Sequence, residues 1–243
     1  MRRPLWIALL AAVAFAVIVL TRLPARWVFP HPAGIACASI DGTVWSGSCS
    51  GLTAQGAALG DLTWDLRPAR LLTGELAAHV VLEHGPVRAR ADLALGLGTG
   101  ITLRNVLADV PLDPAVIPRA PRALHGTVHA QLELLRIAHG ALTELKGRIE
   151  AHDLTQSSGR VTSLGSYAVV FPGGSGEPAG SVQDLGGPLA VQGTLRLTGA
   201  PGYELEGEVA PRPGAAPELV NSLQFLGTPD ALGRRPFSMA GTY

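Results

Sequence analysis

The chain has 243 residues, with 19 basic and 19 acidic side chains and a formal net charge of zero. No basic run follows the N-terminal region, so we expect no nucleic-acid partner. The length leaves room, after one N-terminal apolar segment, for one β-rich domain or two small ones. Aromatic residues make up only 5% of the chain, so any core must be built from Leu, Val, Ile and Ala.

Residues 5–20 form an uncharged apolar run, LWIALLAAVAFAVIVL, which follows Arg2 and Arg3. As a helix these sixteen residues reach about 24 Å, and the stretch from Pro4 to Leu23 comes close to the roughly 30 Å of a bilayer core. The run has no polar face at a 3.6-residue period, which excludes a buried helix of a soluble domain. The sequence therefore predicts a membrane-spanning helix.

A cleaved secretory signal peptide is the alternative, because Ala14-Phe15-Ala16 resembles a cleavage motif. Residues 17–20 continue the apolar run where a signal peptide would turn polar, so we favour an uncleaved anchor. Arginines on both sides of the run leave the orientation open. The two cysteines indicate an oxidising compartment. We expect residues 1–26 to be a cytoplasmic tail and anchor, and residues 27–243 to form an exported, periplasmic β-rich domain.

Cys37 and Cys49 are the two cysteines of the chain and lie twelve positions apart. In an exported domain this spacing indicates one disulfide closing a short loop, which stabilises the fold by roughly 3 kcal/mol. Two unrelated buried thiols are the alternative. We expect no metal site, because no second cysteine pair or spaced histidine pair completes four ligands.

Asp41-Gly42, between two alternating runs, predicts a two-residue hairpin turn. That register places Cys37 opposite Ser46 and leaves Cys49 too far along for a disulfide. A bulge at Gly47, or a strand that curls back, is then needed to bring the two sulfurs together.

Alternating apolar and polar residues predict short strands along most of the remaining chain. The predicted strands are 59–67, 74–83, 87–95, 101–106, 124–135, 166–171, 189–197, 203–209 and 234–243. Segments 107–122 and 172–180 are rich in proline or glycine and predict loops. The period of residues 141–154 is ambiguous, and only residues 217–226 have helical spacing. The pattern predicts a mostly β, antiparallel domain.

No motif indicates a catalytic, cofactor or metal site. His125 and His129 lie in a strand pattern, which separates them by about 13 Å on one face. Residues 47–51, GSCSG, lack the serine of a nucleophile elbow, and residues 96–100 lack the spacing of a phosphate-binding loop. Acidic residues occur singly, without an acid–base pair. We therefore expect no enzyme activity and no cofactor, and a hydrolase is the remote alternative.

Trp45, Trp64 and Arg67 are the candidate contact residues. The two tryptophans lie in strand patterns among small residues, and we favour core aromatics over exposed anchors for a partner. Arg67 precedes Pro68 and could either cap a strand end through a carboxylate or face a partner.

Four segments occur in a characteristic order: GTVWSG from Gly42, LTWDLRPARLLTGEL from Leu62, YELEGEVAPRP from Tyr203 and LQFLGTPDALGRRPFSMAG from Leu223. Together with the N-terminal apolar run, they resemble protein N of the bacterial type II secretion system. The resemblance implies an inner-membrane accessory component of the machine that exports folded proteins from the periplasm across the outer membrane. Its expected partners are other inner-membrane platform or secretin components, and the oligomeric state is open.

The repeated hairpins also resemble the open, curved sheets of AsmA-like proteins, which are linked to lipid transport and outer-membrane assembly. The alternative function is therefore a lipid-handling module with an apolar groove. The two functions differ at the inner face of the sheet. A groove requires a continuous, accessible apolar trough, whereas a scaffold buries that face and interacts through edges or loops.

Overall fold

The computed structural model describes residues 19, 21–28, 34–96, 100–117, 123–157, 161–198 and 202–242. Most of the predicted anchor, residues 1–18 and Leu20, lies outside these ranges and stays a prediction. Within the described ranges no helix is both long enough and apolar enough to cross a bilayer.

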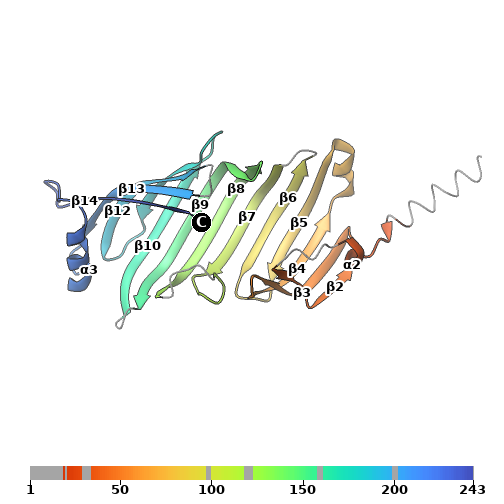
Figure 1. Cartoon of the computed structure of the whole chain (residues 1–243), viewed down its shortest axis with the longest axis horizontal. Helices are drawn as coiled ribbons and strands as arrows, with labels where there is room; N and C mark the ends of the chain where they lie inside the picture. The colour runs from red at the N-terminus through yellow and green to blue at the C-terminus, as the bar shows by residue number, and fades with distance from the viewer. Residues whose placement is uncertain are drawn as a thin grey trace, which may run out of the picture.

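The described chain folds into a single antiparallel sheet whose strands follow one another in chain order (Figure 1). β1 and β2 both pair with β3, and from β3 onward each strand pairs with its chain neighbours. The strands are β1 (Ile35–Ala36), β2 (Ser39–Gly42), β3 (Ser46–Ala54), β4 (Ala57–Leu66), β5 (Glu75–Glu83), β6 (Arg88–Gly96), β7 (Gly100–Pro111), β8 (Leu124–Ala138), β9 (Ala141–Ser157), β10 (Val161–Pro172), β11 (Ala179–Asp184), β12 (Leu189–Thr198), β13 (Gly202–Pro211) and β14 (Arg235–Thr242). The predicted mostly β, antiparallel fold is confirmed.

Short helical segments account for little of the described chain. They are α2 (Ala25–Val28), η1 (Pro68–Thr73), α3 (Pro217–Ser222) and η2 (Leu223–Phe225). α3 and η2 lie within the segment predicted to be helical.

The structure departs from the predicted segments at several places. The predicted loop 107–122 begins too early, because residues 107–111 continue β7 and pair with β8 as far as Pro111 opposite Thr127. β11 was not predicted. Its sequence, AGSVQD, has one branched apolar residue and is held by pairing on both sides. The ambiguous segment 141–154 lies wholly in β9, where three register shifts against β8 interrupt the two-residue period.

One face of the sheet is apolar along its whole width. Directly paired residues point to the same face, so the pairings trace rows across the strands. One row, from β2 to β14, consists of Ile40, Cys49, Leu62, Leu82, Ala89, Ala108, Ala130, Ile149, Val169, Val182, Gly193, Gly207 and Phe237. No polar side chain interrupts it. We call this side of the sheet the apolar face.

The opposite side, which we call the polar face, has a different chemistry. A row beside the first consists of Arg88, Asp109, His129, Glu150, Ala168, Gln183, Gln192 and Glu208. Such alternation of apolar and polar residues is expected of an antiparallel sheet with one face in water.

Helical segments cover the apolar face at its two ends. At the N-terminal end, Ala25 of α2 is buried in one cluster with Cys49 and Trp64. At the C-terminal end, Leu223 of η2 is buried with Leu189 and Val209. β13 and β14 run at a steep angle to β8 in Figure 1, which shows the twist and curvature of the sheet.

Candidate functional site: surfaces and edges of the sheet

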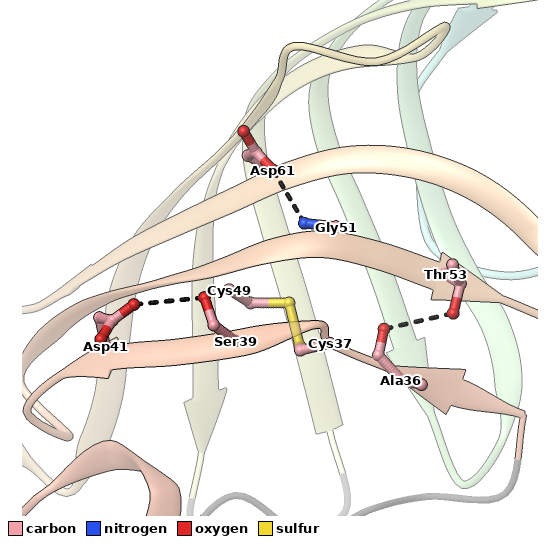
Figure 2. The surroundings of a disulfide bond; sticks show 8 residues. All are labelled: Ala36, Cys37, Ser39, Asp41, Cys49, Gly51, Thr53 and Asp61. Atoms are coloured by element: carbon pink, nitrogen blue, oxygen red, sulfur yellow. Dashed lines mark hydrogen bonds between the residues drawn. A yellow bond between two sulfur atoms is a disulfide. The ribbon is translucent and has the colours of Figure 1, made fainter.

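A disulfide closes the N-terminal end of the sheet (Figure 2). It joins Cys37 to Cys49, with 5.6 Å between the two Cα atoms. The predicted two-residue turn at Asp41-Gly42 is wrong: these residues belong to β2 and pair with Ser48 and Gly47.

The true turn lies three residues later and corrects the cysteine register. Thr43 begins it, and its backbone N–H donates to the carbonyl of Ser46 at 2.9 Å. The shift places Ile40 opposite Cys49. With this register neither a bulge at Gly47 nor a strand that curls back is needed, because Gly47 pairs directly with Gly42. The disulfide therefore forms between Cys49 and the break that separates β1 from β2.

Hydrogen bonds around the disulfide hold these short strands in place (Figure 2). The backbone N–H of Gly51 donates to Oδ1 of Asp61 at 2.8 Å. The hydroxyl of Thr53 donates to the carbonyl of Ala36 at 3.3 Å. The N-terminal edge of the described sheet thus consists of two short strands that are fixed covalently and by side-chain hydrogen bonds.

Trp64 lies inside the N-terminal hydrophobic cluster. The side chain of Trp64 is 7% exposed and contacts the cluster of Ala25 and Cys49. Its Nε1–H donates to the carbonyl of Val44 at 3.1 Å. Trp45 lies between β2 and β3, half-buried, and its carbonyl accepts a hydrogen bond from the backbone of Leu66.

Arg67 lies on the polar face, on the other side of the sheet from the Trp64 indole. Its side chain is 59% exposed, and Nη2 lies 3.6 Å from Oδ1 of Asp92. Asp92 also accepts a hydrogen bond from Asn105 at 2.9 Å and lies 3.0 Å from Nδ1 of His79. The hydrogen bonds from Asn105 and His79 outweigh burial and hold the pKa of Asp92 below its usual value. The candidate residues Trp64 and Arg67 therefore do not form one site.

Ion pairs between neighbouring strands cover the polar face. They include Lys146 with Glu133 at 2.5 Å and Arg136 with Glu144 at 3.2 Å. Exposed pairs of this kind contribute roughly 0–1 kcal/mol each. A depression of about 800 Å³ on this face is lined by residues that include His79 and Arg148. Within the described ranges no group of three His, Cys, Asp or Glu side chains is placed to hold a metal ion.

A partly buried ion pair joins β11 to the end of β13. Nη2 of Arg212 donates to Oδ1 of Asp184 at 2.5 Å, and the backbone N–H of Val191 donates to Oδ2 at 3.1 Å. Burial opposes the charge on Asp184, but the hydrogen bonds from Arg212, Val191 and Gly186 prevail and lower the pKa of this carboxyl. Asp184 thereby connects three consecutive strands. This pair could not be recognised in the sequence, because its members are 28 positions apart.

The two edges of the sheet differ. β14 pairs on one side with β13, and no described strand pairs with its other side. Its eight residues, RPFSMAGT, include Met239 with 54% of its surface exposed. The C-terminal edge is therefore a long strand without a described partner on its outer side. The N-terminal edge consists of short strands held by the disulfide and by hydrogen bonds.

Known proteins match this chain along its length. A family model described as type II secretion system (T2SS), protein N, matches residues 33–238. A relative from Vibrio cholerae serotype O1, named type II secretion system protein N, is 26% identical over 253 residues, and the alignment covers 99% of each chain. A protein of the same name from Aeromonas hydrophila is 28% identical over 257 residues, again with 99% of each chain covered. No solved structure matches the chain. Because the family model covers well over half of the sequence, the chain belongs to the protein N family of the type II secretion system.

Proposed function

We propose that this chain is a single-pass inner-membrane accessory component of the type II secretion system, with its sheet in the periplasm. It supports the export of folded proteins across the outer membrane through protein–protein contacts with platform or secretin components. Support comes from the full-length alignment with relatives named type II secretion system protein N and from the apolar run at residues 5–20.

The open edge of β14 carries the proposal about contacts. Natural sheets protect exposed edges with charges, prolines, bulges or very short strands. In β14 such protection is confined to Arg235 and Pro236 at its start, and residues 237–242, FSMAGT, carry neither a charge nor a proline. A strand from a partner can add to such an edge through backbone hydrogen bonds, while alternate side chains provide specificity.

Crosslinking in cells tests this contact. The photoreactive residue benzoylphenylalanine replaces Met239 in the full chain, in cells that contain the secretion system. Arg196, exposed on β12 within the sheet, is replaced in the same way as the matched control. We expect Met239 to capture a platform or secretin component and Arg196 to capture none. Equal capture at both positions, or none at Met239, would contradict the proposal.

Proline substitution separates the edge contact from the stability of the fold. Successive N–H groups of a strand point to opposite sides, so one of Ser238→Pro and Met239→Pro removes a donor to β13 and the other removes a donor on the open edge. We expect the variant that loses the donor to β13 to destabilise the sheet. We expect the variant that loses the donor on the open edge to reduce secretion, with a urea midpoint close to that of the wild type. Normal secretion in both variants would exclude strand addition at this edge.

A further inference from the structure

We infer that the apolar face between α2 and α3 binds the acyl chains of membrane lipids. This inference goes beyond the secretion role and does not depend on which protein contacts β14. It rests on the pairing register, the exposure of the side chains, the chemistry of the surface and the point at which the chain enters the sheet.

Three parallel rows define the binding surface. The first is the eight-strand portion from Leu62 to Val182 of the row described above. The second consists of Leu66, Ala78, Leu93, Leu103, Leu135 and Leu145. The third consists of Leu76, Leu95, Ile101, Ile137 and Leu142. Every side chain in the three rows is aliphatic.

Side chains at the centre of this surface are buried, and those near the ends of the strands are exposed. Leu132, Leu145 and Phe171 pack together at the centre and are at most 7% exposed. At the ends of the strands, Leu76 and Ile101 are 38% and 37% exposed. The described helical segments that pack on this face lie at its two ends, in the clusters of Ala25 and of Leu223. In the middle, Leu195 and Leu197 of β12 pack against the central cluster, so the curved sheet covers its own centre and leaves the apolar side chains near the strand ends open.

A sheet with one apolar face normally buries it against another layer. At strand and residue spacings of about 4.8 Å and 3.3 Å, the three rows from β4 to β9 cover on the order of 600 Å². A protein interface of that size carries roughly 3–6 hydrogen bonds. The side chains of these rows offer no donor or acceptor, which suits hydrocarbon and not a protein surface.

The membrane anchor proposed above, on which this step rests, places the apolar face beside a bilayer. The apolar run ends at Leu20, and α2 begins at Ala25. Ala25 is fully buried against Cys49 and Trp64 at the end of the apolar face. A membrane that holds residues 5–20 therefore lies within a few residues of the apolar face, and lipid chains can pass from one apolar environment to the other.

Photolabelling of the full chain tests the inference. The protein is placed in vesicles of phosphatidylethanolamine and phosphatidylglycerol that contain a little phosphatidylcholine with a diazirine on one acyl chain. After irradiation, mass spectrometry locates the lipid adducts. We expect adducts on sheet residues of the apolar face, such as Leu103 and Ile137, and none on Thr102 or Arg136, their neighbours on the polar face. Adducts confined to residues 1–28, or spread evenly over both faces, would overturn the inference.

Two adjacent substitutions provide the matched control. Leu103→Asp places a charge in the middle row of the apolar face, and Thr102→Asp places it on the polar face of the same strand. We expect sheet labelling to fall roughly ten-fold in the first variant and to stay unchanged in the second. If Leu103→Asp does not fold, the adduct map of the wild type still decides the question. A second copy of the chain that shields the face would abolish the sheet adducts and overturn the inference, whether or not Met239 captures a secretion component.

Discussion

Trp64 lies directly opposite Gly47 in the β3–β4 pair, and its indole fills the space that a side chain on Gly47 would occupy. A Cβ atom on Gly47 would lie 2.5 Å from Cζ2 of Trp64. Phe237 covers Gly207 in the same manner at the other end of the sheet. An aromatic residue paired across strands with glycine covers backbone that the glycine leaves exposed. The same aromatic–glycine pairing therefore occurs near both ends of the sheet.

Gly47→Ala should destabilise the protein by about 2 kcal/mol, because the added methyl group displaces the indole from the cluster. Gly96→Ala is the control, since a Cβ there meets nothing within 4 Å. Urea denaturation followed by tryptophan fluorescence measures both variants. Equal midpoints for the two variants would show that the Trp64–Gly47 contact is unimportant.

Removal of the disulfide should lower the free energy of unfolding by about 3 kcal/mol, the entropy cost expected for a loop of this length. The double variant Cys37→Ala, Cys49→Ala tests this in urea. Wild type in the presence of a reductant should approach the same midpoint, and the double variant should not respond to reductant. A wild-type midpoint that is insensitive to full reduction would contradict the prediction.

Asp184→Asn should destabilise the protein at pH 7 by about 2 kcal/mol, because it removes the charge that holds Arg212. The folded pKa of Asp184 lies below its usual value of 3.8, so the carboxylate favours folding above that value. This contribution is lost as the pH falls through the folded pKa. The difference between wild type and variant should therefore be constant from pH 7 to about pH 5 and shrink below 3.8.

Asp41→Asn, an exposed carboxyl at the other end of the sheet, is the control and should change stability by less than about 0.5 kcal/mol. Urea midpoints across this pH range decide the matter. A wild-type advantage over Asp184→Asn that is as large at pH 3 as at pH 7 would show that charge is not its source.

Gly147→Ala should destabilise the middle of the sheet by about 3 kcal/mol or more. Gly147 has φ +140°, and a Cβ there would overlap the backbone of Gln131 and Leu132 on β8. Gly140→Ala, at φ +79° with nothing within 4 Å, isolates the backbone cost of about 1 kcal/mol. If the two variants have equal urea midpoints, close approach between β8 and β9 does not constrain the sheet.

The strands could be predicted where one face meets water, because alternation then gives a clear two-residue period. In β8, Val128, Ala130 and Leu132 face one side while His129 and Gln131 face the other, and this segment was predicted with its correct start. Where bulges shift the register, as in β9, the period breaks and the prediction fails. The sequence of β11 alternates too weakly between apolar and polar residues to be recognised as a strand by itself.

The turn near Asp41 shows how local preference is overridden. The Asp-Gly pair is a strong hairpin signal, but bonds between Thr43 and Ser46 form the turn instead. The candidate surfaces were still less predictable. Each strand showed an apolar side, but only the pairing register shows that these sides join into rows. The partner of Arg67, Asp92, lies two strands away along the sheet and is likewise set by register.

Because each strand pairs with its neighbours in the chain, a sheet of this kind can be widened by the insertion of hairpins. From β4 to β14, each strand is hydrogen-bonded only to its neighbours in the chain, so strand pairing proceeds along the sheet much as in repeat proteins. A chain that gained one hairpin between β9 and β10 would keep every strand pairing except that between β9 and β10, and its apolar face would widen by roughly 10 Å. Proteins of this architecture can therefore differ in the width of the sheet by whole hairpins while the length of the strands stays the same.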